Sequence, residues 1–128
     1  MEWIRDYQLY LKLKKIIKIA NFVNVNPKQI TFYRSYGSSA RAYARIWGLP
    51  RIWQQALNIK PHYIIEVISE KFDKLSEYDK IKTLIHELLH IPKNFSGSLV
   101  PHKGVRNYNV NQKIVERIFN EYKVGENI

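Results

Sequence analysis

One amphipathic stretch decides the fold of this chain: residues 76–92, with the sequence SEYDKIKTLIHELLHIP. Apolar side chains recur in it every three or four residues, and this spacing predicts a helix that buries one face. Ser76 is a typical N-cap with an acidic residue three positions later, and Pro92 ends the helix. The residues on the predicted buried face are Tyr78, Ile81, Leu84, Ile85, Leu88 and Leu89.

The same helix carries two histidines four positions apart, in the motif His86-Glu87-Leu88-Leu89-His90. Residues at this spacing lie one turn above each other, so both imidazoles project from one face and can bind one metal ion. Glu87 lies about 100° round the helix from His86, where it can reach a water molecule without becoming a ligand. The motif therefore predicts one zinc ion (Zn2+) per chain, with Glu87 as the general base of a hydrolytic reaction.

The third ligand of this predicted site must come from elsewhere in the chain, since a catalytic zinc ion usually has three protein ligands and one open position. We expect His102, which follows His90 by twelve residues in a loop with Ser and Gly that can fold back to the helix. The alternative is a carboxylate from the C-terminal helix, Glu116 or Glu121, although both lie off its apolar stripe. The spacing leaves these alternatives open.

Four other polar residues are candidates for contacts with a substrate or with a developing oxyanion. His62 directly precedes a predicted strand, where it could line the cleft, and Tyr108 follows His102 in the same loop. Lys103 and Arg106 also carry donors suited to an oxyanion. Their position in the sequence is the only observation that selects them, and a structural or surface role for His62 is the simpler interpretation.

The composition narrows the class of protein. A chain of 128 residues with 45% hydrophobic residues predicts a single domain, residues 1–128. It has no cysteine, which excludes disulfide bonds, thiol catalysis and cysteine-bound metal, so histidine and carboxylate remain as ligands. The net charge of +10 is compatible with nucleic acid as a partner, but the lysines are spread along the chain and support this only weakly.

The sequence also bears on location. No apolar run approaches the roughly 20 residues that a helix needs to cross a bilayer. Glu2, Arg5 and Asp6 interrupt the apolar stretch that an export signal would require. We therefore expect a soluble, cytoplasmic protein with no membrane partner. The oligomeric state does not follow from the sequence.

Patterns on either side of the motif predict the remaining elements of an α+β fold. From Trp3 to Ala20 a helical spacing, with lysines between the apolar residues, predicts an amphipathic helix packed across a sheet. Its predicted apolar stripe consists of Ile4, Tyr7, Leu11, Ile16 and Ile19. A second amphipathic helix is expected over residues 110–123, after a loop over 93–107. Strands are expected at residues 30–34, 40–47 and 63–69, with a short helix at 51–57.

Several short segments carry a resemblance to a known family. Three of them lie at or after the motif: HELLHIP at residues 86–92, Phe95-Ser96-Gly97 and Pro101-His102-Lys103-Gly104. The likeness extends back to about residue 30 through two more, Tyr33-Arg34-Ser35 and Gly48-Leu49-Pro50. Together they resemble a family of small metallopeptidases found mainly in archaea, within the zincin group. The Pro-His-Lys-Gly segment is the more specific part, because all zincins share the first motif.

This resemblance implies a minimal zincin-like fold: a small mixed sheet packs against the N-terminal helix and the active-site helix, with a C-terminal helix. It implies that the edge strand of the sheet borders the substrate cleft, and we expect the strand at 63–69 to be that edge. An extended peptide could then add its backbone to the edge. Carried over residue by residue, His86, His90 and His102 are the ligands and Glu87 is the base.

The sequence departs from the metzincin pattern, in which a Gly and a third histidine follow the motif at short, fixed spacing. Here Pro92-Lys93-Asn94 follows the motif without a Gly, and the spacing to the next histidine, His102, is longer. Met1 is the only methionine, so the methionine-containing turn is also missing. Metzincin substrate rules therefore do not transfer.

Two hypotheses from different classes follow. The first is a zinc metallopeptidase that acts on a peptide or protein, including the variant in which the substrate is bound to DNA, as for SprT-type zincins. The second is a non-catalytic, zinc-containing basic module that binds nucleic acid or a protein partner. Glu87 favours the first, because a structural zinc site has no need of a carboxylate beside its ligands.

Overall fold

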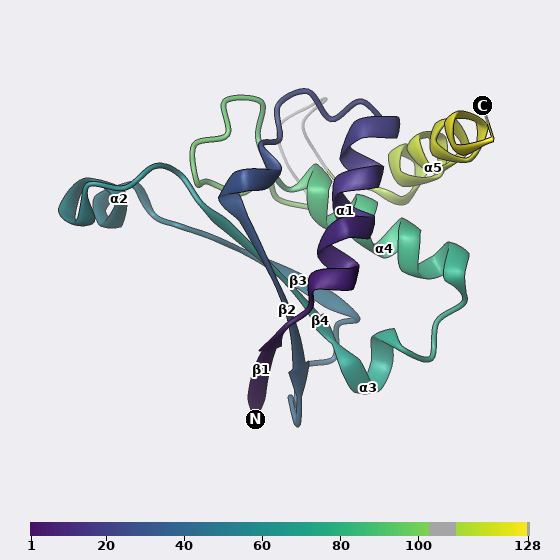
Figure 1. Ribbon diagram of the computed structural model, residues 1–128, viewed down its shortest axis with the longest axis horizontal. Coiled ribbons are helices and arrows are strands. Elements are labelled where there is room, and N and C mark those ends of the chain that lie inside the picture. Colours follow the sequence, from purple (N-terminus) through teal and green to yellow (C-terminus); the bar gives the residue numbers. More distant parts are fainter. Residues whose placement is uncertain (103–109, 128) are drawn as a thin grey trace.

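The computed structural model describes residues 1–102 and 110–127, which form a four-stranded mixed sheet with two longer helices packed on one face (Figure 1). A third long helix, at the C-terminus, packs against those two helices. The strand order is β1-β2-β4-β3, in which β2 and β4 are parallel and the two outer pairs are antiparallel. Along the chain the elements are β1 (Glu2–Arg5), α1 (Tyr7–Ile19), the 3₁₀ helix η1 (Pro27–Gln29), β2 (Ile30–Tyr36), β3 (Ala44–Gly48), α2 (Arg51–Leu57), β4 (Tyr63–Ile68), α3 (Ser69–Phe72), α4 (Glu77–Leu89) and α5 (Gln112–Glu126).

The hydrophobic core lies between the sheet and the helices α1, α4 and α5. Side chains alternate between the two faces of a strand, so one set from each strand turns toward the helices. From β4 this set is Tyr63, Ile65 and Val67, all fully buried. They meet the fully buried apolar face of α4, which includes Leu84, Ile85 and Leu88. None of the described helices is long and apolar enough to cross a membrane.

Side-chain caps fix where the three long helices begin. The Asp6 carboxylate accepts a hydrogen bond from the Leu9 amide at the start of α1, and the Ser76 hydroxyl accepts one from the Asp79 amide at the start of α4. Asn111 caps α5 in the same way. These bonds satisfy amides that have no partner inside the helix, and the Ser76 cap is the one that the sequence predicts.

The predicted N-terminal helix is wrong in its first turn. Residues 2–5 form β1, which pairs with β2, and the helix begins only after Asp6. The buried stripe of α1 is Leu13, Ile16 and Ile17, so Ile16 of the predicted stripe is buried, whereas Tyr7 is 67% exposed. The local periodicity could not reveal this, because the pairing partner of β1 lies about 30 residues further along the chain.

The expected edge strand is also wrong. Residues 63–69 were expected to border the cleft, whereas β4 lies inside the sheet between β2 and β3. The edge strand beside the cleft is β3, which begins four residues later than expected, at Ala44. An interior position agrees with the burial of β4, in which five of the six residues are buried.

One carboxylate interrupts the apolar run of β4 and ties the edge strand to it. Glu66 is fully buried, and its Oε1 accepts hydrogen bonds from Arg45 Nε at 2.8 Å and from the Trp47 indole at 2.9 Å. Burial by itself would raise the pKa of Glu66, but hydrogen bonds from Arg45, Ser35 and Trp47 outweigh it and the pKa is lowered. This cluster therefore holds β3 against β4 on the face that carries no long helix.

We expect Glu66→Ala to lower the free energy of unfolding by about 1–3 kcal/mol at pH 7, because Arg45 and Trp47 lose their acceptor. The folded-state pKa of Glu66 lies below its unfolded value, so its contribution is complete above the unfolded pKa and is lost as pH falls through the folded pKa. Urea unfolding of both proteins from pH 7 to pH 3 measures this. A difference in stability that stays constant into acid would contradict the assignment.

Candidate metal centre and active-site cleft

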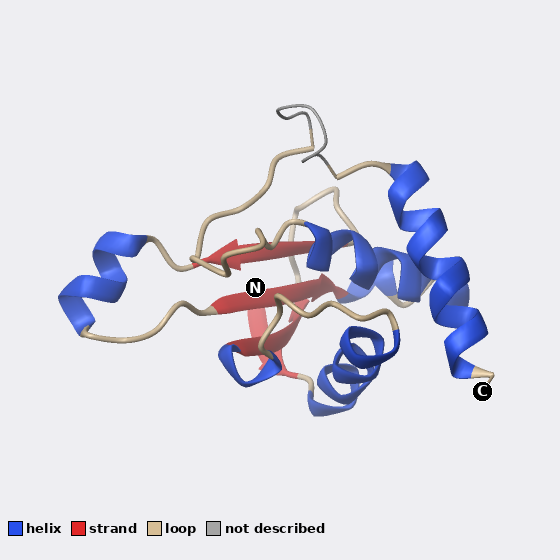
Figure 2. Ribbon diagram, turned by 90° about the horizontal axis from the view of Figure 1, so that it is seen from above, coloured by secondary structure: helices blue, strands red, loops and turns tan. Residues whose placement is uncertain are grey.

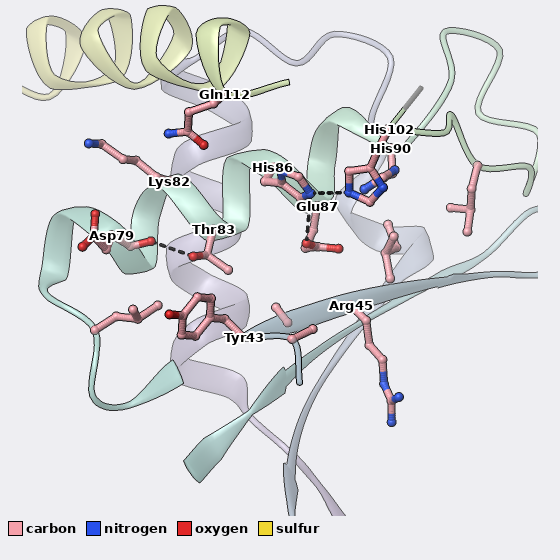
Figure 3. Close-up of a pocket in the computed structure, with 15 residues that line it drawn as sticks. Tyr43, Arg45, Asp79, Lys82, Thr83, His86, Glu87, His90, His102 and Gln112 are labelled. Atoms are coloured by element: carbon pink, nitrogen blue, oxygen red, sulfur yellow. Dashed lines mark hydrogen bonds and ion pairs between the residues drawn. The ribbon is translucent and has the colours of Figure 1, made fainter. Parts of the chain in front are cut away.

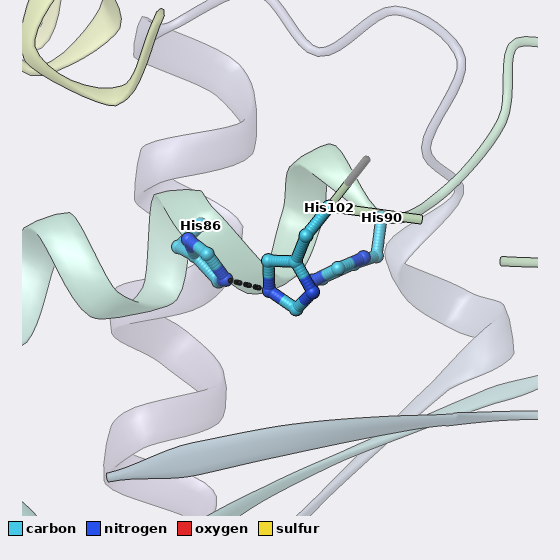
Figure 4. A group of neighbouring side chains, drawn as sticks. All are labelled: His86, His90 and His102. Carbon is cyan, nitrogen blue, oxygen red and sulfur yellow. Dashed lines mark hydrogen bonds between the residues drawn. The ribbon is translucent and has the colours of Figure 1, made fainter. Parts of the chain in front are cut away.

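Three imidazoles converge at the C-terminal end of α4 (Figure 4). His86, His90 and His102 each offer a ring nitrogen, and these atoms all lie within 4.8 Å of one another. The Nε2 atoms of His86 and His102 are 2.9 Å apart. Residues that are distant in the sequence thus present three nitrogen donors to one point.

The chain positions the third histidine through a pair of hydrogen bonds to the second. The Val100 amide donates to the His90 carbonyl at 2.7 Å, and the His90 ring Nδ1 lies 2.5 Å from the Val100 carbonyl oxygen. His90 is also the C-cap of α4, where its own amide donates to the Glu87 carbonyl and the Ile91 amide donates to the Leu88 carbonyl. The segment that leads to His102 is therefore fastened directly to the end of the motif helix.

The protonation of His86 and His90 suits metal binding. A carbonyl accepts only from a protonated nitrogen, so the bond to Val100 places the proton of neutral His90 on Nδ1 and leaves the Nε2 lone pair available. Burial, together with the charges of His90 and His102, lowers the pKa of His86 to about 4. The pKa of His90 is lowered mainly by burial, although its bond to Val100 opposes this. A donor set of three imidazole nitrogens fits a divalent transition metal.

A buried carboxylate stands beside the three rings. Glu87 is only 5% exposed, and its Oε2 lies 4.0 Å from His86 Nε2. Burial raises the pKa of Glu87 to about 8 in the protein without a metal. A carboxyl group with a pKa near neutrality is suited to moving a proton at physiological pH.

The rings and the carboxylate lie in a cleft of about 690 Å³ between α4 and the edge strand β3 (Figure 3). Figure 3 shows His86, Glu87, His90 and His102 grouped at one end, with Thr83 and Asp79 further along α4. Besides these, the cleft is lined by Ala42, Tyr43, Ala44, Arg45, Ile46, Leu75, Lys82, Leu99 and Gln112.

The structure separates the two alternatives for the third ligand. His102 joins the histidine group, whereas Glu116 forms an ion pair with Lys82 at 3.0 Å and accepts a hydrogen bond from Gln112. Glu121 is exposed on α5 and is not part of the group. Geometry therefore brings His102, and neither glutamate, to the pair from the motif.

His62, the one remaining predicted contact among the described residues, does not reach the cleft. His62 lies outside the lining residues, with its Nε2 2.8 Å from the Thr31 hydroxyl oxygen. Lys103, Arg106 and Tyr108 lie outside the described residues.

Several lining residues were not predicted from the sequence. Lys82 and Thr83 stand one turn before His86, so the helical periodicity contained a signal for them. Tyr43 and Ala44 had no such signal, because only the order of the strands shows that β3 borders the cleft.

A mixed sheet packed on a helix that carries this motif, with a third histidine supplied by a loop, defines a zincin-like fold. Residues 1–123 match the family described as "Putative phage metallopeptidase", and the chain belongs to this family. The comparisons with curated proteins and with solved structures found no match. The family supports the resemblance to small metallopeptidases, while the association with archaea stays a prediction.

We expect the purified protein to bind about one divalent metal ion per chain. At a zinc concentration a hundredfold above Kd, binding would stabilise the fold by about 2.7 kcal/mol. His102→Ala should lose the ion and most of this stabilisation, because it removes one of three converging nitrogens. Elemental analysis and thermal unfolding with added zinc measure both effects.

Glu116→Ala and His62→Ala are the matched controls, since neither residue reaches the histidine group. Loss of metal from Glu116→Ala, with retention by His102→Ala, would overturn the three-histidine site.

Proposed function

We propose that this chain is a zinc-dependent peptidase in which His86, His90 and His102 hold the ion and Glu87 is the general base. One observation carries the proposal: three imidazoles converge, with ring nitrogens within 4.8 Å of one another, beside a buried carboxylate in a cleft bordered by a sheet edge. Membership of a metallopeptidase family supports it independently.

A zinc ion held by these imidazoles would polarise the scissile carbonyl, lower the pKa of water and, through its charge, favour the ionised form of Glu87. The Glu87 carboxylate then takes the proton of the attacking water and delivers it to the nitrogen of the leaving amine. Its burial excludes competing water from this transfer. We retain Tyr108, six residues after His102, as the proposed donor to the developing oxyanion.

The free edge of β3 is suited to hold the backbone of a peptide. The carbonyl of Tyr43 and the amide of Leu49 both bond to the β4 side. Backbone groups alternate in direction along a strand, so those of Ala44 and Ile46, between them, point away from β4 and toward the cleft. An extended substrate could pair with these groups without depending on its side chains, which favours peptides or unfolded protein segments as substrates.

Glu87→Gln should retain the metal and lose peptide hydrolysis, because the amide keeps the shape of the carboxylate but cannot accept a proton. The expected decrease in kcat/KM is about 10²–10⁴-fold. Cleavage of a peptide library followed by mass spectrometry gives the activity, and elemental analysis gives the metal content. Equal activity in both proteins would remove Glu87 from the mechanism.

Ala44→Pro removes one amide that points toward the cleft and leaves the hydrogen bonds to β4 intact. If a substrate pairs with this edge, kcat/KM should decrease about 2–10-fold, the equivalent of one hydrogen bond. The urea midpoint of the variant, compared with that of the wild type, shows whether the fold is retained. A folded variant with unchanged kcat/KM would argue against pairing at β3.

The competing function is a non-catalytic, zinc-containing basic module that binds nucleic acid or a protein. A wild-type protein that binds one zinc ion, cleaves no member of the library and shifts DNA or RNA in a gel at physiological salt would favour it. This outcome also separates the two hypotheses when the metal site itself is correct.

A further inference from the structure

The connection between β3 and β4 projects away from the rest of the molecule as an arm, residues 49–62, which contains α2 (Figures 1 and 2). No residue of α2 is buried. Ile52 is 77% exposed, Trp53 55% and Leu57 56%, and Ile59 directly after the helix is also exposed. Large apolar side chains gathered on a projecting element mark an interaction surface, since a monomer gains nothing from exposing them.

The α2 arm is held in place at its base. Gln54 Nε2 donates to the Leu49 carbonyl at 2.7 Å and to the Ser96 carbonyl at 2.8 Å. At the other end of the arm, Gln29 Nε2 donates to the Pro61 carbonyl at 2.6 Å. The apolar side chains of the arm are therefore presented by a fixed base, which lowers the entropy lost when a ligand binds.

The arm continues directly from the walls of the cleft. The edge strand β3 leads into it at Gly48, which packs so closely on Gly97 that an added Cβ would lie 2.1 Å from the Gly97 oxygen. Gln54 also bonds to the Ser96 carbonyl, and three residues after Ser96 the chain reaches Leu99, which lines the cleft. A chain lying along β3 and leaving the cleft at this end would therefore meet the arm.

Charge indicates what the arm can bind. No acidic residue occurs between Asp6 and Glu66, a stretch that includes the whole arm. The arm itself carries Arg51 and Lys60, and the chain as a whole has a net charge of +10. A second copy would bring like charges together, whereas a ligand with apolar and acidic side chains would complement the arm in both respects.

We propose that the α2 arm is an exosite that binds an unfolded segment of the protein substrate carrying apolar and acidic side chains, while an adjoining part of that segment lies along β3. The proposal rests on the proposed peptidase function and adds the class of substrate. It also gives Ile52, Trp53 and Leu57 a role that the cleft does not require. Such an arm adds affinity for long substrates through a second contact on the same chain.

Binding is measured first with the Glu87→Gln protein, so that cleavage does not interfere. The probes are reduced, carboxymethylated α-lactalbumin, which is unfolded and acidic, and reduced, carboxamidomethylated lysozyme, which is unfolded and basic. We expect tight binding of the acidic probe only, and at least tenfold weaker binding after the triple substitution Ile52→Ser/Trp53→Ser/Leu57→Ser. The matched control is Val23→Ser/Val124→Ser, because both valines are exposed outside the arm.

Charge is tested separately with Arg51→Glu/Lys60→Glu. This variant should bind the acidic probe at least tenfold more weakly and the basic probe more tightly than before. Circular dichroism and zinc binding equal to those of the parent protein show that fold and metal site are retained. Equal affinity of the triple variant and its parent would overturn the proposal.

The active protein then links the arm to catalysis. With Glu87 in place, the triple variant should cleave carboxymethylated α-lactalbumin at least tenfold more slowly, while kcat/KM for a peptide of about six residues stays unchanged. An equal decrease for both substrates would overturn the exosite. So would a wild-type dimer, seen by sedimentation, that the triple substitution dissociates, because a second copy would then occupy the arm.

Failure of the peptidase function gives a different result from failure of the exosite. If the wild type cleaves nothing, yet binding to the acidic probe depends on the arm, hydrolysis is overturned while the ligand class of the arm is supported.

Discussion

The packing of α4 against the sheet is the constraint on which both the fold and the candidate site depend. One face of this helix buries Leu84, Ile85 and Leu88 completely, and that burial is the main source of its stability. His86 and His90 lie on a different face of α4 from these apolar residues. The same packing keeps them there, because the helix cannot rotate without exposing its apolar face. The core thus fixes the imidazoles on the face of α4 that lines the cleft.

The reciprocal hydrogen bonds between His90 and Val100 connect this helix to the rest of the site. They satisfy the His90 carbonyl at the end of α4, orient the His90 ring, and hold the segment that carries His102. One pair of residues therefore caps the end of the helix, sets the tautomer of the His90 ring and helps to position His102. This economy suits a small chain, which has few residues to spare for supporting a site.

The edge strand β3 connects the other two functional surfaces. Glu66 holds β3 to β4 on the face of the sheet without long helices. The backbone groups of β3 that point away from β4 border the cleft, and the C-terminal end of β3 leads into the α2 arm. A strand that is fixed on one side and open on the other is a template for an extended chain. The proposed pairing of substrate with β3 and its proposed capture by the arm both follow from this position.

The sequence by itself determined the motif helix, its Ser76 cap, the short helix at residues 51–57 and the chemical types of the donor set, because periodicity, capping and imidazole spacing are local properties. It favoured His102 over Glu116 without excluding either. Only the tertiary structure decided that residues 2–5 pair as a strand, that β4 is internal, and that His102 rather than Glu116 reaches the motif. Strand order and loop closure depend on contacts between distant residues, and local patterns do not encode them.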